Sequence, residues 1–432
     1  MLFRLFFFGQ RLRANFRMRL KLTGLWHHAD FLRLWSGQTL SVFGSMIGGT
    51  AMTFTATLFL QATPFQMGML NALQVAPAFL GGLFAGAWVD RVRRRPLLIG
   101  TDLGRALVLS CIPLAAFASR LRIELLYLVA VVVSMLTVIF DVAYHSYLPG
   151  LIGKSDLVEG NSKLSASAAA AEFGGFSIAG WLVQALTAPF AILVDAGSFV
   201  VSAITVGLIQ AREQSIIPQA HPDMRQEIAQ GLQFVWRMPL LRATALATLI
   251  LGLSRGIFGA LVVFYMNRGL GFTPGILGLI WAVGAVSTSI GAAFTPLLTR
   301  RLGPGPAMIL GLTAFGVSLF FIPMARGATF LSATLLVAQQ LGDGFYVVYD
   351  VNQVSIRQKI TPEHLLGRVN ATFQFLSLGT SLLGSLLGGL LGEVLGVRSV
   401  LVLGGCVTLL AALMLAAPSL RKFRGTAVAD DN

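Results

Sequence analysis

Long apolar segments alternate with short polar breaks along almost the whole chain. Each segment has about 20 residues or more, the length that an α-helix needs to cross the hydrocarbon core of a bilayer. The pattern predicts twelve membrane-spanning helices, over residues 35–60, 66–89, 96–118, 123–148, 163–186, 189–211, 243–267, 275–299, 306–325, 328–356, 369–395 and 399–418. Because this number is even, both ends of the chain are expected on the same side of the membrane.

The composition agrees with this pattern. Of the 432 residues, 55% are hydrophobic and only 12% are charged, whereas soluble domains have about 25% charged residues. A water-soluble fold is therefore excluded, and twelve spans leave almost no length for a separate soluble domain. We expect an all-α membrane protein, whose 47 glycines allow close approach of helices in lipid.

The net charge of +14 would suggest a nucleic-acid partner in a soluble protein. Here the N-terminal arm, the alternate loops and the tail hold 26 of the 32 lysines and arginines. The opposite face holds five, Arg120, Arg122, Arg268, Arg326 and Arg398. By the positive-inside rule this split places both termini in the cytoplasm. The charge then indicates topology and contact with anionic lipids, and it requires no nucleic acid.

The longest polar stretch, residues 212–242, divides the chain into two sets of six spans. Within it, Ile228, Leu232, Val235 and Trp236 recur at helical spacing, which predicts an amphipathic helix on the inner membrane surface. The expected organisation is a basic cytoplasmic arm (1–34), a six-helix bundle (35–211), a cytoplasmic linker (212–242), a second six-helix bundle (243–418) and a cytoplasmic tail (419–432).

The two sets of six spans also resemble each other. A shift of 209 residues lays Asp141-Val142, Ser146, Leu157 and Asn161 on Asp350-Val351, Ser355, Leu366 and Asn370. Duplicated halves around a central pathway are the usual build of secondary transporters. We therefore predict two pseudosymmetric six-helix bundles.

Few ionisable residues fall inside the predicted spans, where burial of a charge in lipid is costly. Glu172, Arg255 and Asp343 lie well within their spans, and we interpret them as substrate-binding or proton-coupling residues. A partly desolvated carboxyl group can exchange a proton near neutral pH. The alternative is a structural ion pair between either acid and Arg255.

Four further ionisable residues form a second tier. Asp141 and Asp350 lie about two turns from the cytoplasmic ends of their helices, and Asp195 lies near the outer end of its helix. We interpret these three as caps or as ties between helices, with contact to the substrate as the alternative. His145, between two tyrosines, is interpreted as an interfacial anchor, with a proton relay as the alternative.

Two other groups of polar residues occur within the spans. Asp102 and Arg105 are one turn apart and can pair locally. Several amides are candidates for lining a pathway, although periodicity does not say which of them face it: Gln38, Gln74, Gln184, Asn352, Gln353 and Gln374.

The loop after the second predicted helix combines a glycine, an acid and several bases, in the order Gly86-Ala87-Trp88-Val89-Asp90-Arg91-Val92-Arg93-Arg94-Arg95. Asp90 follows a helix C-terminus, where the macrodipole disfavours negative charge, so its carboxylate needs cationic or N–H partners. The loop resembles the signature G-x-x-x-D-[RK]-x-G-[RK]-[RK] of the major facilitator superfamily.

This resemblance implies that Gly86, Asp90, Arg91 and Arg94 form a conformational latch. In the family, the latch joins the two halves on the cytoplasmic side in the outward-facing state and releases on inward opening. Arg93 stands where the family has its second glycine. The alternative is a positive-inside cluster with one incidental acid.

Further motifs resemble one branch of that superfamily, the transmembrane secretion effector group with its macrolide efflux proteins and enterobactin exporter. They are FLRLWSGQ at 31–38, FDVA at 140–143, LVDAGSF at 193–199, GLQFVW at 231–236 and TPEHLLGRV at 361–369. The chain departs from proton-linked drug antiporters at two places. Residues 175–180 (GFSIAG) lack the proline of the antiporter motif, and the fourth span contains no arginine.

Enzyme motifs such as G-x-S-x-G, H-E-x-x-H and the P-loop do not occur in the sequence. Cys111 and Cys406 are far apart and lack metal-ligand spacing, so we expect neither a metal site nor a cofactor.

We therefore predict a monomeric, non-enzymatic secondary transporter with the major facilitator fold, in the bacterial cytoplasmic (inner) membrane. It exports a small amphipathic molecule, drug-like or a siderophore, by alternating access coupled to protons. The export direction and the coupling rest on the resemblance. The alternatives are an importer or lipid flippase of the same fold, or a non-transporting membrane receptor or scaffold.

Overall fold

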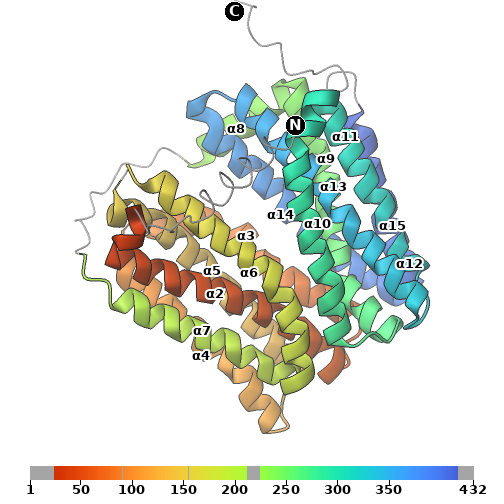
Figure 1. Cartoon of the computed structure of the whole chain (residues 1–432), viewed down its shortest axis with the longest axis horizontal. Helices are drawn as coiled ribbons and strands as arrows, with labels where there is room; N and C mark the ends of the chain where they lie inside the picture. The colour runs from red at the N-terminus through yellow and green to blue at the C-terminus, as the bar shows by residue number, and fades with distance from the viewer. Residues whose placement is uncertain (1–23, 90, 154, 212–223, 417–432) are drawn as a thin grey trace, which may run out of the picture.

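The protein consists of two helical bundles, each formed by one half of the chain (Figure 1). The computed structural model describes residues 24–89, 91–153, 155–211 and 224–416, except for the side chains of 82–87, 172–173 and 224–228. Most of the expected N-terminal arm, residues 212–223 of the expected linker and the expected tail lie outside these ranges. Within them every regular element is a helix, and there are no strands.

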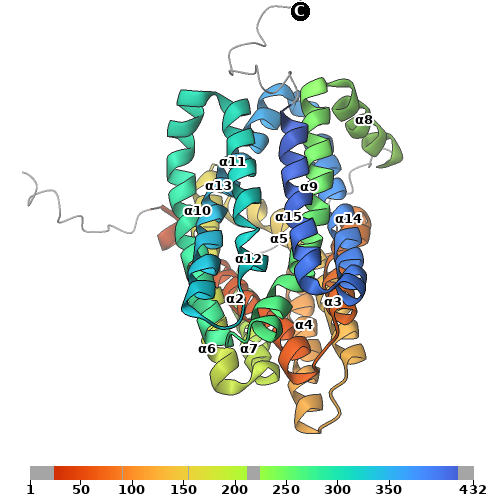
Figure 2. The ribbon, with the colours of Figure 1, turned by 90° about the vertical axis from the view of Figure 1, so that its right-hand side faces the viewer.

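The first bundle contains α2 (Ala29–Phe54), α3 (Pro64–Val89), α4 (Arg94–Phe117), α5 (Ile123–Ile152), α6 (Leu157–Leu186) and α7 (Ala188–Gly207). The second contains α9 (Pro239–Phe264), α10 (Pro274–Leu302), α11 (Pro304–Ser318) with α12 (Phe321–Met324), α13 (Phe330–Ile360), α14 (Glu363–Leu395) and α15 (Val397–Leu415). Short elements are η1 (Gly24–His27), η2 (Thr55–Phe59), η3 (Tyr265–Gly269) and α8 (Met224–Arg237). Figure 2 shows α10, α11, α15 and α9 side by side in the second bundle.

Each predicted span lies over one long helix, except 306–325, which is divided between α11 and the short α12. Ten helices of the described ranges are long and apolar enough to cross a membrane. The other two, α3 and α13, have 26 and 31 residues and pack within the same bundles. The prediction of an all-α, multi-pass membrane protein is confirmed.

Several helices extend beyond the predicted apolar spans at polar ends. α2 begins at Ala29, although residues up to 34 were assigned to the arm, because the Nδ1 atom of His28 accepts a hydrogen bond from the N–H of Phe31 at 3.0 Å. Likewise, α6 begins at Leu157 and α14 at Glu363. Hydropathy marks the part of a helix that lies in hydrocarbon, whereas capping sets where the helix ends.

The two bundles repeat the same neighbour relations. In the first, α2 packs on α6 and α7, α3 on α5, and α4 on α5 and α7; in the second, α9 packs on α14 and α15, α10 on α13, and α11 on α13 and α15. In addition, α2 and α9 each end in a π-helical turn, closed by an N–H of Leu60 and of Leu270. The pseudosymmetry predicted from the repeat is therefore present in three dimensions.

The bundles meet at the end of the molecule opposite α8 and diverge toward α8 (Figure 1). At the closed end α3 packs on α14 and α6 packs on α10. Glycines form both contacts: a Cβ atom on Gly389 would lie 2.9 Å from Cα of Gly68, and one on Gly180 would lie 3.1 Å from Cα of Gly278. Small residues thus allow the two bundles to touch through their backbones.

The helix α8 lies where the spacing predicted an amphipathic helix. It packs on α14, where Arg368 donates to the side-chain oxygen of Gln230. Leu232 and Trp236 of α8 remain exposed, whereas Val235 is buried. The exposed pair is suited to contact with the membrane surface.

Candidate functional site

A cavity of about 550 Å³ lies on the side of the second bundle that faces the first. Its wall is mainly apolar and aromatic, with contributions from α9, α10, α11, α13 and α15, and with Phe176 from α6 of the first bundle. Its polar and charged lining residues are few: Ser254, Arg255, Thr288, Gln339, Gln340, Asp343 and Thr408. We call it the central cavity.

Arg255 of α9 and Asp343 of α13 both line the central cavity. The Arg255 side chain is exposed and that of Asp343 is half-buried. The Oδ1 atom of Asp343 accepts a hydrogen bond of 3.1 Å from the amide of Gln339, one turn earlier. No salt bridge joins Arg255 to Asp343 in the described part of the chain. Two opposite charges therefore face one cavity without neutralising each other by direct contact.

A second cavity of about 320 Å³ adjoins the central cavity at Asp343. The two share a wall formed by Phe176, Trp281, Thr288, Gln340 and Asp343. The ring of Trp281 lies 5.9 Å from that of Phe176 and 6.4 Å from that of Phe54. Since these phenylalanines belong to the first bundle, Trp281 forms an aromatic bridge between the two bundles.

A third cavity, also of about 320 Å³, adjoins the central cavity at Arg255 and lies between α9, α13 and α14. Asp350 and Arg357 line it, and the guanidinium of Arg357 lies 4.7 Å from the ring centroid of Phe373. The structure thus places Asp350, interpreted as a tie between helices, on a cavity wall. Charged side chains continue from Asp343 through Arg255 to this cavity.

Four of the amides divide into cavity-lining and packing residues. Gln353 and Gln374 line the third cavity. Asn352 is buried, as Gln353 is, but it accepts a hydrogen bond from Thr299 at 3.0 Å and lines none of these cavities. Gln184 accepts one from the N–H of Gly275 at 3.2 Å and so links the two bundles.

Glu172 lies in α6, and its side chain is outside the described set. Ala169 lines the second cavity, and Phe176 lines both it and the central cavity. The role of Glu172 therefore stays a prediction.

The first bundle contains a buried charged pair whose environment the sequence did not reveal. Arg105 lies inside the bundle with 3% of its surface exposed. It donates to Oδ1 of Asp102 at 2.5 Å, as the spacing predicted. Its guanidinium lies 4.4 Å from the ring centroid of Phe140 and 4.0 Å from that of Phe199. Arg105 is therefore paired inside the first bundle, whereas Arg255 faces a cavity.

Asp195 is buried where α7 crosses α2. Ser45 donates to its Oδ1 atom at 3.3 Å, and a Cβ atom on Gly48 would lie 2.0 Å from its Oδ2 atom. The carboxylate fills the space that this glycine leaves, which is the geometry of a tie between helices. Asp141 and His145 of α5 are exposed, one turn apart.

The latch loop is described in part. Asp90 lies outside the described set, Gly86 lies in α3, Arg91 is exposed and Arg94 begins α4. The latch stays a prediction. Sequence reasoning did not single out Arg95, which donates to the carbonyl oxygens of Gly207 at 2.6 Å and of Val206 at 3.3 Å. These carbonyls end α7, where a cation is favourable. The run of bases in the sequence indicated a cationic loop, but it did not identify which base binds the end of α7.

The family model described as Major Facilitator Superfamily matches residues 34–376 and 244–427. The chain belongs to the Major Facilitator Superfamily. As a member of this superfamily the protein is a membrane transporter of small molecules and not an enzyme, as the sequence predicted.

Curated relatives of this superfamily member match most of its length. The uncharacterized MFS-type transporter YfiS of Bacillus subtilis is 25% identical over 89% of this chain and 91% of its own. The multidrug efflux pump Tap of Mycolicibacterium fortuitum is 24% identical over 80% of this chain and 85% of its own. Macrolide efflux protein A of Streptococcus pyogenes is 24% identical over 91% of this chain and 96% of its own. The efflux relatives agree with the branch that the motifs resemble.

Solved structures of other transporters share the fold. The nucleoside transporter NupG superposes with a TM-score of 0.70 at 13% identity, over 91% of this chain and 99% of its own. A bacterial homologue of the iron transporter ferroportin, in its inward-facing state, superposes with a TM-score of 0.70 at 20% identity, over 90% and 99%. The major facilitator fold predicted from the sequence is confirmed.

Proposed function

We propose that the protein exports a small amphipathic molecule, drug-like or a siderophore, by proton-coupled alternating access across the bacterial inner membrane. The observation that carries this proposal is the central cavity, in which Arg255 and Asp343 face an apolar and aromatic wall. Its volume of about 550 Å³ suits a small organic ligand. The aromatic wall would bind the apolar body of that ligand, and the two charges would orient its polar group. The efflux relatives support the outward direction.

The topology inferred from the charges supports an inward-open state. With both termini cytoplasmic, the closed end at Gly68 and Gly389 faces outward. The third cavity continues from Arg255 toward Arg357 and Asn370, near the cytoplasmic ends of α13 and α14. A substrate would therefore reach the central cavity from the cytoplasm.

We assign proton coupling to Asp343, with Glu172 as the second candidate. Asp343 lies where the central and second cavities join, and the described residues form no salt bridge with it. A carboxyl group in such a setting can exchange a proton when a ligand arrives or leaves. The guanidinium of Arg255 would bind an anionic or electron-rich group of the substrate.

Reconstitution into liposomes tests the proposal, after a compound panel in a pump-deficient bacterial strain has identified substrates. With an imposed pH gradient, the purified protein should move the compound in the export direction. Asp343→Asn should still bind the compound but no longer respond to the gradient. Glu363→Gln, which changes an exposed carboxylate in the first turn of α14, is the matched control and should transport normally.

Three results would overturn parts of the proposal. Movement in the import direction would replace export by uptake. Transport by the unaltered protein that ignores the pH gradient would remove proton coupling. Unchanged coupling in Asp343→Asn would remove Asp343 from the pathway of protons.

A further inference from the structure

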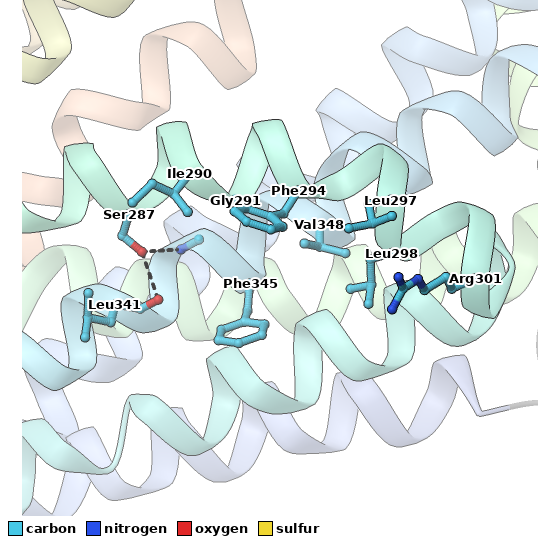
Figure 3. A pocket seen from close by; sticks show the side chains of 11 residues that line it. Ser287, Ile290, Gly291, Phe294, Leu297, Leu298, Arg301, Leu341, Phe345 and Val348 are labelled. Atoms are coloured by element: carbon cyan, nitrogen blue, oxygen red, sulfur yellow. Dashed lines mark hydrogen bonds between the residues drawn. The ribbon is translucent and has the colours of Figure 1, made fainter. Parts of the chain in front are cut away.

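A groove separate from the central cavity runs between α10 and α13 (Figure 3). It has a volume of about 400 Å³. Its sides are large apolar residues, each at least 43% exposed: Ile290, Phe294, Leu297, Leu341 and Phe345. The polar residues of its lining are Ser287 at one end and Arg301 at the other.

Small residues form the floor of this groove. A Cβ atom on Gly291 would lie 2.2 Å from the carbonyl oxygen of Gly344, so the two helices touch through their backbones. Ser287 donates to the carbonyl oxygen of Leu341 at 2.8 Å and accepts from the N–H of Gly344 at 3.1 Å. Its one O–H donor is therefore used within the protein. The floor offers no free donor, and the groove is apolar along its length up to Arg301.

Arg301 gives the groove a charged mouth. It lies in the last turn of α10, is exposed, and forms no salt bridge with any residue that the structure describes. Arg300 shares that last turn but does not line the groove. A cation near a helix C-terminus interacts favourably with the macrodipole. This interaction explains equally why Arg300 and Arg301 lie in the last turn of α10. It does not account for the position of one of them at the groove.

The length of the groove matches half a bilayer. Arg301 lies fourteen positions after Ser287, which corresponds to about 21 Å along a helix. One leaflet of a bilayer, with its headgroup region, is about 20–22 Å thick. With Arg301 at the cytoplasmic surface, as the distribution of charges predicts, the groove extends from the inner headgroup region to the middle of the membrane.

We propose that this groove binds one anionic phospholipid of the inner leaflet. One acyl chain lies between α10 and α13, and the phosphate is bound by Arg301. An arginine guanidinium matches the geometry of a phosphate with two parallel N–H donors. A net negative headgroup is favoured, because a zwitterionic lipid brings its own cation to a site that already carries one. The inference does not depend on the substrate or on the direction of transport.

Native mass spectrometry of the full chain, titrated with phosphatidylglycerol and phosphatidylcholine of identical acyl chains, tests this site. The unaltered protein should retain one phosphatidylglycerol in preference to phosphatidylcholine. Arg301→Gln should lower that preference about tenfold, the loss expected for a charge-assisted contact. Arg301→Lys should keep part of it. Arg300→Gln, the matched control, should keep all of it.

A second pair of variants tests the groove itself. Ile290→Trp fills the groove and should reduce retention of both lipids several-fold without changing charge. Leu279→Trp lies on the same face of α10, three turns away and outside the groove, and should have no effect. Equal retention of the two lipids by the unaltered protein would overturn the proposal. So would equal losses in Arg301→Gln and Arg300→Gln, or unchanged retention in Ile290→Trp.

Discussion

Gly68 of α3 and Gly389 of α14 join the two bundles by direct backbone contact. A Cβ atom on Gly68 would lie 2.7 Å from Cα of Gly389, and one on Gly389 would lie 2.9 Å from Cα of Gly68. The pseudosymmetry places Gly278 of α10 and Gly180 of α6 in the same relation. The closed end of the molecule therefore depends on two pairs of glycines between which no side chain fits.

Gly389→Leu is expected to prevent closure at this end, because the added side chain has no space between α14 and α3. In a background in which Cys111 and Cys406 are replaced by Ala, a cysteine at Val262 in the central cavity should react several-fold faster with an impermeant maleimide added outside. Gly197→Leu is the matched control, because a Cβ atom there meets nothing within 4 Å. Equal labelling in the two variants would contradict the prediction.

Trp281→Ala should weaken substrate binding about tenfold, because it removes the aromatic bridge between the bundles and the stacking surface of two cavities. The rings of Phe54 and Phe176 would lose their partner on α10. Equilibrium binding of a labelled substrate to purified protein measures the change. Trp236→Ala removes an exposed tryptophan of α8 and should leave affinity unchanged. Similar affinities in the two variants would exclude Trp281 from the binding site.

Arg105→Leu should lower the free energy of unfolding by about 3–5 kcal/mol, because it leaves the buried Asp102 carboxylate without its cation. The free energy of unfolding of Arg105→Lys should lie between those of Arg105→Leu and the unaltered protein. The ammonium group keeps the charge but lacks the flat face that lies between Phe140 and Phe199. Thermal unfolding in detergent, followed by intrinsic fluorescence, measures both.

The matched control for this pair is Arg33→Leu. Arg33 also bonds an aspartate three residues away, Asp30, at 2.7 Å, but its side chain is 32% exposed. Such a pair contributes about 0–1 kcal/mol. If Arg105→Leu and Arg33→Leu lowered the free energy of unfolding by the same amount, burial of the Arg105 pair would have no energetic consequence. That result would contradict the prediction.

The charge distribution predicts the sidedness of the loops. A cysteine at Ala328, between α12 and α13, should react with an impermeant reagent in intact cells, again with Cys111 and Cys406 replaced. A cysteine at His364, at the start of α14, should react only after the cells are permeabilised. The reverse result would place both termini outside and would invert the proposed direction of opening.

Local physics explains how much of the fold was predictable. A helix in lipid must satisfy its backbone hydrogen bonds internally, so each span is decided within its own residues and is visible in hydropathy. The helix ends were less predictable, because a single contact such as that of His28 with Phe31 moves the start of α2 into the polar arm. The motifs added the superfamily, which the family comparison confirmed.

The candidate site was predictable only as a set of residues. Arg105 and Arg255 are both arginines within apolar segments, yet one lies between two rings and the other faces a cavity. Asn352 and Gln353 are adjacent, yet Thr299 binds the first while the second lines a cavity. Successive residues of a helix point about 100° apart, so only the neighbouring helices decide which of them meets the pathway.

The sequence by itself therefore determined the membrane-spanning fold, its internal repeat and its superfamily, because these depend on local hydropathy and on motifs. Only the tertiary structure decided that Asp343 and Arg255 share one cavity, that Arg105 pairs away from it, and that glycines join the two bundles at one end. These facts depend on how distant helices approach each other, and no single helix carries that information.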